Sequence, residues 1–188
     1  MKGRVIMIHG TMGSPERAWF PWLSNQLGVC SVPVIAPLFP TPQNQSLDEW
    51  FAVLFRSVKE INELDVLIGH SLGVAFVLRV LEKVASPVRA AYLVAGFSNL
   101  LGEPEYDVLH ETFLKVPFDW NKLASASSRY RVYAGDNDPL VPMSASQELA
   151  RMLNVKLTVV KGGGHLNGTF GYTSFQLLLD DLKSDLQF

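Results

Sequence analysis

Short apolar runs alternate with amphipathic stretches along the whole chain. Six of these runs have the length, turn-rich borders and apolar content of buried strands, at residues 4–8, 32–36, 65–69, 88–94, 130–134 and 155–160. Parallel strands that are buried on both faces give such continuous apolar runs, and the helices between them cover the sheet. The pattern therefore predicts an α/β protein with a reduced, six-stranded, mainly parallel sheet and helices on both faces.

The amphipathic stretches carry recognisable helix starts. Ser14-Pro15 predicts an N-cap with proline in the first turn, ahead of an apolar stripe at Trp19, Trp22, Leu23 and Leu27. Ser46 to Glu49 forms a capping-box pattern, and Ser144 with Gln147 repeats it. The remaining apolar stripes are at Trp50, Val53, Leu54, Val58 and Ile61; at Leu149, Met152 and Leu153; and at Phe175, Leu178, Leu179, Leu182 and Leu186.

The stretch from residue 96 to 128 is the least regular part of the chain. Its proline and charge pattern predicts short helices near residues 105–114 and 120–124. This is too little chain for a separate lid domain. Because it leaves the strand beside the one that ends at Gly69, we expect it to form one wall of a cleft.

Length and composition limit the possible classes. The 188 residues, 48% hydrophobic and 18% charged, predict one globular domain over residues 1–188. A net charge of −2 gives no reason to expect nucleic acid or an anionic membrane as partner. A protein partner is not indicated either. The lone Cys30 cannot form an internal disulfide and is expected to be a small buried residue. With no signal peptide and no apolar run of membrane-spanning length, we expect a cytoplasmic protein.

The pentapeptide Gly69-His70-Ser71-Leu72-Gly73 is the main candidate for chemistry. It follows the apolar run Val66-Leu67-Ile68 directly and precedes a helical pattern. A serine at such a strand-to-helix turn is typical of the nucleophile elbow of α/β-hydrolases. Gly69 and Gly73 remove side chains where the strand and helix pass closely, and the helix N-terminus suits an oxyanion.

A nucleophilic serine needs a base, and the base needs a carboxylate that orients it. In α/β-hydrolases the acid and then the histidine follow the serine along the chain. Asp136 and Asp138 come after the strand at residues 130–134, and His165 follows the strand at 155–160. Asp138 is favoured as the acid because the prolines after it fix its direction, whereas Asp136 suits a turn.

The other histidines fit less well as the base. His70 lies inside the elbow with its side chain expected to point away from the hydroxyl, and His110 precedes the acid and is expected at the surface. His9 opens the turn after the first strand, where the second oxyanion N–H arises in this fold. We assign that N–H to Thr11, with Met12 as the alternative, and the first to Leu72.

Other classes of site have weaker support. Gly10-Thr11-Met12-Gly13 lacks the third glycine of a dinucleotide fingerprint, and no phosphate-binding P-loop motif occurs. The residues Asp136, Asp138 and His165 have no known metal-ligand spacing. We expect no cofactor and no metal.

These motifs together resemble a known family. His9-Gly10, the elbow, Asp138-Pro139-Leu140-Val141-Pro142 and Gly164-His165 are similar to the small, lidless serine hydrolases of the retinoblastoma-binding-protein-9 and YdeN type. The segment at 117–123 extends the resemblance, which spans nearly the whole chain. The resemblance implies a triad of Ser71, Asp138 and His165. Gly168-Thr169-Phe170-Gly171 departs from the family pattern and is expected to reshape the mouth of the pocket.

The expected function is hydrolysis of small or medium acyl esters through an acyl-enzyme, with thioesters and amides sharing the same oxyanion chemistry. The partner would be a small-molecule acyl substrate. The alternative is a binding or scaffold protein that keeps the hydrolase fold without turnover, since fold alone does not fix function.

Overall fold

A six-stranded sheet forms the centre of the computed structural model, which describes residues 3–186. The strand order is β2-β1-β3-β4-β5-β6, and every neighbouring pair is parallel. The predicted sheet is confirmed. Its strands are β1 (Val5–Ile8), β2 (Val34–Ile35), β3 (Val66–His70), β4 (Ala90–Val94), β5 (Tyr130–Gly135) and β6 (Leu157–Val160).

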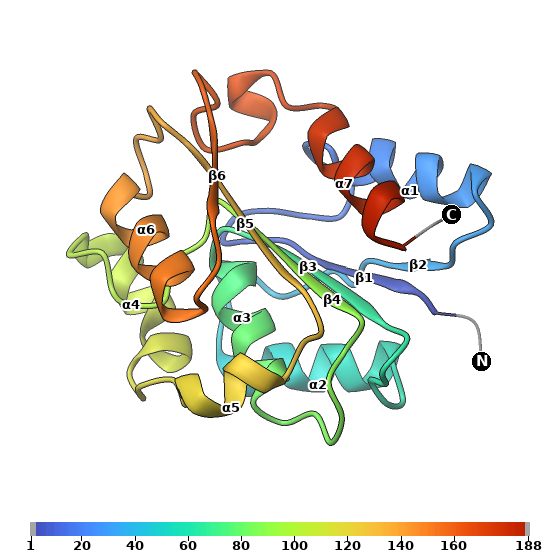
Figure 1. Cartoon of the computed structure of the whole chain (residues 1–188). Coiled ribbons are helices and arrows are strands. Elements are labelled where there is room, and N and C mark those ends of the chain that lie inside the picture. Colours follow the sequence, from blue (N-terminus) through green and yellow to red (C-terminus); the bar gives the residue numbers. More distant parts are fainter. Residues whose placement is uncertain (1–2, 187–188) are drawn as a thin grey trace.

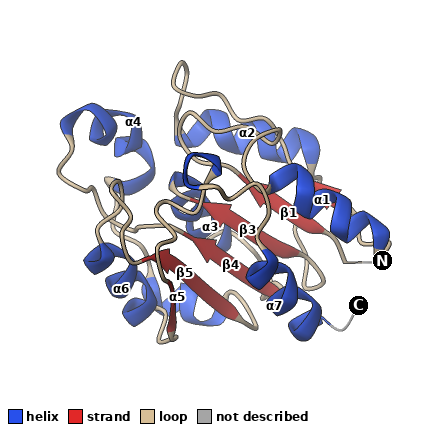
Figure 2. Ribbon diagram, turned by 90° about the horizontal axis from the view of Figure 1, so that it is seen from above, coloured by secondary structure: helices blue, strands red, loops and turns tan. Residues whose placement is uncertain are grey.

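Helices cover both faces of the sheet (Figures 1 and 2). One face packs on α1 and α7, and the other packs on α2 to α6. The helices are α1 (Phe20–Val29), α2 (Leu47–Ser57), α3 (Leu72–Leu81), α4 (Pro104–Leu114), α5 (Trp120–Ser125), α6 (Met143–Met152) and α7 (Gln176–Leu186), with a short 3-10 turn, η1 (Gly168–Phe170).

The strand β1 shows why apolar runs, rather than alternating ones, mark this sheet. Val5 and Met7 enter the core on the α1 and α7 side, while Ile6 and Ile8 enter the core on the α3 side. All four side chains are at most 1% exposed. A strand between two helical layers has two core faces, so it has no polar face to show.

Two of the three predicted helix caps are wrong. The Ser46 hydroxyl caps α2 by accepting from the Glu49 N–H, as predicted. However, α1 begins at Phe20 instead of after Ser14, because Ala18 adopts a left-handed φ of 53° that no helix continues through. Likewise α6 begins at Met143 after Pro142, so Ser144 lies inside the helix and does not cap it.

The ends of the apolar stripes also differ from the prediction. The helix α2 stops at Ser57, so Val58 is a buried residue just beyond it and Ile61 lies outside. Phe175 is buried immediately before α7, and the side chain of Leu186 lies outside the described residues. Cys30 at the end of α1 is half-buried, not fully buried as predicted.

The irregular segment 96–128 folds into α4 and α5, close to the predicted positions, and adds a wall to the core without forming a separate lid. Arg79 of α3 anchors it by donating to the carbonyls of Phe113 and Val116 while pairing with Glu82. The Arg79 guanidinium also lies 3.8 Å from the centre of the Phe118 ring. The Arg79 side chain therefore fixes the position of a segment that is only partly helical.

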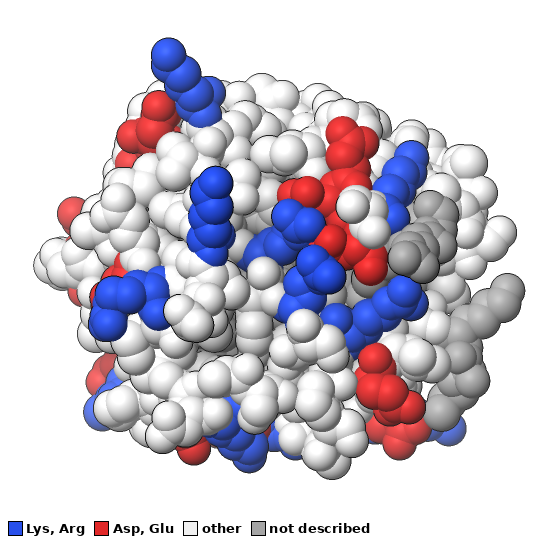
Figure 3. All heavy atoms as spheres, viewed as in Figure 1, with Lys and Arg blue, Asp and Glu red and all other residues white. Residues whose placement is uncertain are grey.

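A charged cluster joins α7 to the sheet. Asp185 lies 2.6 Å from the Arg131 Nε and 3.2 Å from Arg129, and it accepts a 2.8 Å hydrogen bond from Tyr92. Arg131 also pairs with Asp181. Figure 3 shows these acidic and basic side chains gathered on the face over α7. No helix within residues 3–186 combines the length and apolar character that a bilayer-spanning helix needs.

Candidate active site

A cavity of about 650 Å³ opens at the carboxyl ends of the strands. Its lining includes Thr11 after β1, Ser71 after β3, Phe97 after β4, Leu140 after β5 and His165 after β6. The strand order reverses between β1 and β3, and ligands of open α/β sheets bind at such a switch point. The topology therefore brings the candidate residues from distant parts of the sequence to one site.

Ser71 stands at the sharp turn between β3 and α3. Its φ of 56° and ψ of −126° are unusual for a non-glycine residue and cost about 1–3 kcal/mol. A Cβ at Gly69 would lie 2.6 Å from the Gly73 carbonyl oxygen, and one at Gly73 would lie 2.3 Å from the Ile8 carbonyl oxygen. Both positions therefore require glycine, and the Ser71 N–H donates to the Val94 carbonyl on the neighbouring strand.

Gly10 is part of a motif in the sequence, but its close contact with Ser71 was not predicted from it. A Cβ at this position would lie 2.7 Å from the Ser71 Cβ and 3.2 Å from the Ser71 Oγ. Glycine lets the turn after β1 pass directly over the serine. Only the contact between β1 and β3 reveals this, because sixty residues separate the two turns.

Asp138 and His165 form a buried pair. The Asp138 Oδ2 lies 2.7 Å from the His165 Nδ1, and the two side chains are 2% and 5% exposed. The other carboxylate oxygen accepts hydrogen bonds from the Leu140 and Val141 N–H groups at 2.8 and 3.1 Å. The backbone of the Pro-Leu-Val-Pro segment thus fixes the carboxylate so that one oxygen is directed at the imidazole.

The neighbours of Asp138 hold the two loops together. Asp136 accepts from the Gly162 N–H and Asn137 accepts from the Gly164 N–H, each at 2.7 Å. Asp136 therefore supports the turn that precedes His165 and makes no hydrogen bond to the imidazole, which favours Asp138 over Asp136 as the acid.

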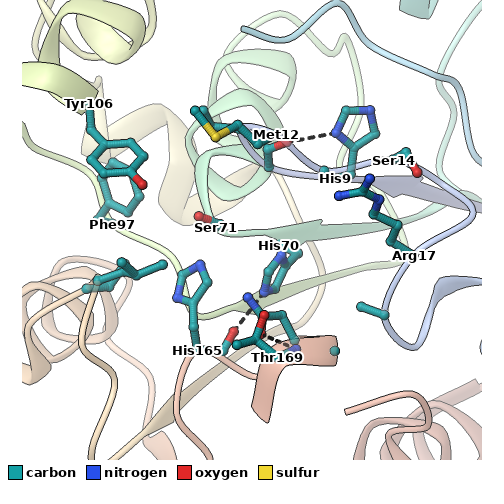
Figure 4. Close-up of a pocket in the computed structure, with 18 of the residues that line it drawn as sticks. His9, Met12, Ser14, Arg17, His70, Ser71, Phe97, Tyr106, His165 and Thr169 are labelled. Atoms are coloured by element: carbon teal, nitrogen blue, oxygen red, sulfur yellow. Dashed lines mark hydrogen bonds between the residues drawn. The ribbon is translucent and has the colours of Figure 1, made fainter. Parts of the chain in front are cut away.

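His165 faces the same cavity as Ser71, and Figure 4 shows its ring beneath the serine hydroxyl. The His70 side chain points away from the space between Ser71 and His165. Its Nε2–H donates to the His165 carbonyl over 2.9 Å, and burial is the main cause that lowers its pKa to about 3. The neutral His70 side chain thus supports the loop that carries His165. Trp19 adds a second support by donating to the Leu166 carbonyl over 3.0 Å.

The candidate oxyanion donors lie on two sides of Ser71. Leu72 is the first residue of α3, where backbone N–H groups have no partner inside the helix. In the turn after β1, the Met12 N–H already donates to the Thr41 Oγ1 over 2.8 Å. This bond favours the Thr11 N–H over that of Met12.

A polar network holds the Thr11 turn. Gln45 Nε2 donates to the Thr11 Oγ1, and His110 Nε2 lies 3.0 Å from the same oxygen. His9 keeps the turn closed because its Nε2 accepts from the Phe39 N–H and its Nδ1 lies 2.8 Å from the Gly10 carbonyl oxygen. Burial lowers the pKa of His9, so it stays neutral near pH 7.

The prediction that His110 lies at the surface is wrong. Its ring is 4% exposed, it packs against Phe97, and burial lowers its pKa to about 4. A helical signal for this was present, since His110 shares the i, i+3, i+4 spacing with the buried Phe113 and Leu114. The stretch after His165 also reaches the site, because Gly168 and Thr169 line the cavity as expected.

Comparisons with known proteins identify the family. The serine hydrolase family model matches residues 5–184. YdeN of Bacillus subtilis (strain 168) is 32% identical over 186 residues, covering 98% of this chain and 96% of YdeN. Serine hydrolase RBBP9 of Rattus norvegicus is 24% identical, covering 97% of this chain and 95% of RBBP9.

Solved structures agree with this. The crystal structure of the B. subtilis ydeN gene product superposes with a TM-score of 0.90 at 30% identity, covering both chains fully. The meta-cleavage product hydrolase of Pseudomonas fluorescens IP01 gives 0.66 at 15% identity, covering 100% of this chain and 90% of that one, which is a likeness of fold. The chain has the α/β-hydrolase fold. It belongs to the serine hydrolase family.

Proposed function

We propose that this serine hydrolase cleaves carboxylic esters of small or medium acyl groups, with Ser71 as nucleophile, His165 as base and Asp138 as the orienting acid. The observation that carries the proposal is the buried 2.7 Å contact between Asp138 and His165 beside a strained serine. A carboxylate held in this way sets the tautomer of the imidazole and stabilises the imidazolium that forms during attack.

The reaction is acyl transfer to water in two steps. His165 takes the proton of Ser71 as the Oγ attacks the ester carbonyl, and it then gives that proton to the departing alcohol. The tetrahedral oxyanion would accept hydrogen bonds from the N–H groups of Leu72 and Thr11. Water, deprotonated by His165, then attacks the acyl-enzyme, releases the carboxylic acid and restores Ser71.

The size of the cavity favours a small or medium ester over a large substrate. Its volume of about 650 Å³ falls in the range of pockets for small molecules, and segment 96–128 lines one side of it. Thioesters and amides pass through the same tetrahedral intermediate, so the test below includes one of each to measure the leaving-group preference.

The test is a panel of p-nitrophenyl esters of increasing acyl length, together with a matched thioester and anilide. We expect turnover of the shorter esters by the wild type and a loss of at least about 10⁴-fold in Ser71→Ala. Ser144→Ala, which removes an exposed hydroxyl on α6, serves as the matched control and should keep full activity. Equal turnover by the wild type and Ser71→Ala would contradict the proposal.

The alternative function is binding without turnover on the same fold. It would be favoured if a folded wild-type protein hydrolysed no member of the panel.

A further inference from the structure

The cavity around Ser71 has two chemically different ends. One end is mostly apolar: Phe97, Leu101, Tyr106 and Leu140 line it after β4 and β5, and Glu103 is the one carboxylate that the described residues place there. The other end is polar and is formed by the β1–α1 loop and the stretch after His165, with Ser14, Arg17, Asn167 and Thr169. Figure 4 shows Phe97 and Tyr106 on one side of Ser71, with Ser14 and Arg17 on the opposite side.

Arg17 is distinctive at the polar end. Among residues 3–186 it is the one lysine or arginine that lines the cavity, and Figure 4 shows its guanidinium directed into the pocket near Ser14. Arg4, Arg79 and Arg131 each hold a carboxylate within 3.1 Å. Within the described part of the chain, Arg17 makes no such ion pair. Its charge is therefore available to a ligand.

We infer that the pocket selects esters that carry a carboxylate group, with Arg17 binding that group and the hydrocarbon part lying against Phe97 and Tyr106. A guanidinium presents paired N–H donors whose geometry matches the two oxygens of a carboxylate. The hydroxyls of Ser14 and Thr169 lie at the same end of the cavity and can add donors. The inference rests on the proposed function, since it names the substrate class of that same site.

The charge at the other end sets the orientation. Glu103, the acidic residue of the cavity lining, is the N-cap of α4, and its carbonyl accepts a hydrogen bond from the Tyr106 N–H in the first turn. A substrate carboxylate placed there would be repelled, whereas the same group beside Arg17 would be attracted. Both charged residues therefore favour one orientation of an anionic ester.

Two pairs of esters test the preference. On the acyl side, p-nitrophenyl hydrogen adipate is compared with p-nitrophenyl heptanoate, which has nearly the same length without the charge. On the alcohol side, meta-acetoxybenzoate is compared with its methyl ester. For each pair the readout is the ratio of kcat/KM for the anionic ester to that for the neutral one, so intrinsic reactivity cancels between protein variants.

We expect the ratio to fall about tenfold in Arg17→Gln for at least one pair, as when a hydrogen bond to a charged group is lost. Arg17→Lys, which keeps the charge and loses the paired donors, should give an intermediate ratio. Arg56→Gln removes an exposed arginine of α2 outside the cavity and should keep the wild-type ratio. Added salt should lower the wild-type ratio, because it screens the pair.

An unchanged ratio in Arg17→Gln for both pairs would overturn the inference while leaving ester hydrolysis intact. Binding of adipate to Ser71→Ala, measured by calorimetry, reads the same site without turnover. If binding weakens when Arg17→Gln is added and no ester is hydrolysed, the substrate-binding role of Arg17 stands and the proposed function fails. If adipate does not bind and no ester is hydrolysed, both fail.

Discussion

Two buried aspartates, Asp138 and Asp185, show how the same residue type is used for different ends. Their side chains are 2% and 4% exposed. Asp185 pairs with the cations Arg131 and Arg129 and accepts a hydrogen bond from the Tyr92 hydroxyl. Asp138 instead contacts an imidazole and two backbone N–H groups. A carboxylate that is already paired with permanent cations does little to stabilise a charge that forms during a reaction. One that faces an imidazole can stabilise the positive charge that forms there during catalysis.

The sharpest test of this contrast is Asp138→Asn. The amide keeps the shape but favours the wrong tautomer of His165, so we expect kcat to fall by about 10⁴-fold. Asp136→Asn is the matched control, two positions away with a role in the turn, and its kcat should fall less than about tenfold. Ester-hydrolysis kinetics check both, and the opposite ranking would move the acid to Asp136.

For Asp185→Asn we expect a loss of stability with little change in kcat. Removing the carboxylate takes away the shortest ion pair of Arg131, which keeps Asp181 as a partner and is 29% exposed, so the free energy of unfolding should drop by about 2 kcal/mol. Denaturant unfolding measures this loss. The folded fraction should retain wild-type kcat, and a large loss of kcat at full folding would show that Asp185 also serves the site.

The support beneath His165 gives a smaller effect. In His70→Phe the hydrogen bond to the His165 carbonyl is lost while the packing against Trp19 is kept, and kcat should fall about tenfold with little change in KM. A rise in KM at constant kcat would instead mean that His70 contacts substrate.

The last prediction concerns the pH dependence of stability instead of catalysis. The pKa values of His70 and His110 are lowered to about 3 and about 4, with burial as the main cause, while the unfolded chain titrates near 6.5. The unfolded state thus binds more protons between these values. Stability is complete above pH 6.5 and should fall by about 1.4 kcal/mol per pH unit for each group as the pH drops toward 4. Urea unfolding at several pH values measures this slope, to which the buried His9 also contributes. His70→Phe should lower the slope by about 1.4 kcal/mol per pH unit, and an unchanged slope would contradict the buried, neutral His70.

The sequence predicted those parts of the structure that depend on local pattern. The strand before Ser71 and the Ser46 cap of α2 are set by neighbouring residues, and both were found where the pattern indicated. The start of α1, the burial of His110 and the Arg131–Asp185 cluster depend on partners 54 to 99 positions away or on a single left-handed residue. No local pattern encodes such contacts, so only the folded chain reveals them.

Covalent labelling measures whether Ser71 is activated, as the proposed contact with His165 and Asp138 requires. Wild-type protein and Ser71→Ala are exposed to a fluorophosphonate, which phosphonylates an activated serine, and intact masses are recorded. We expect a single adduct on the wild type and none on Ser71→Ala. A folded wild type without an adduct, or an adduct that persists in Ser71→Ala, would contradict the proposed role of Ser71.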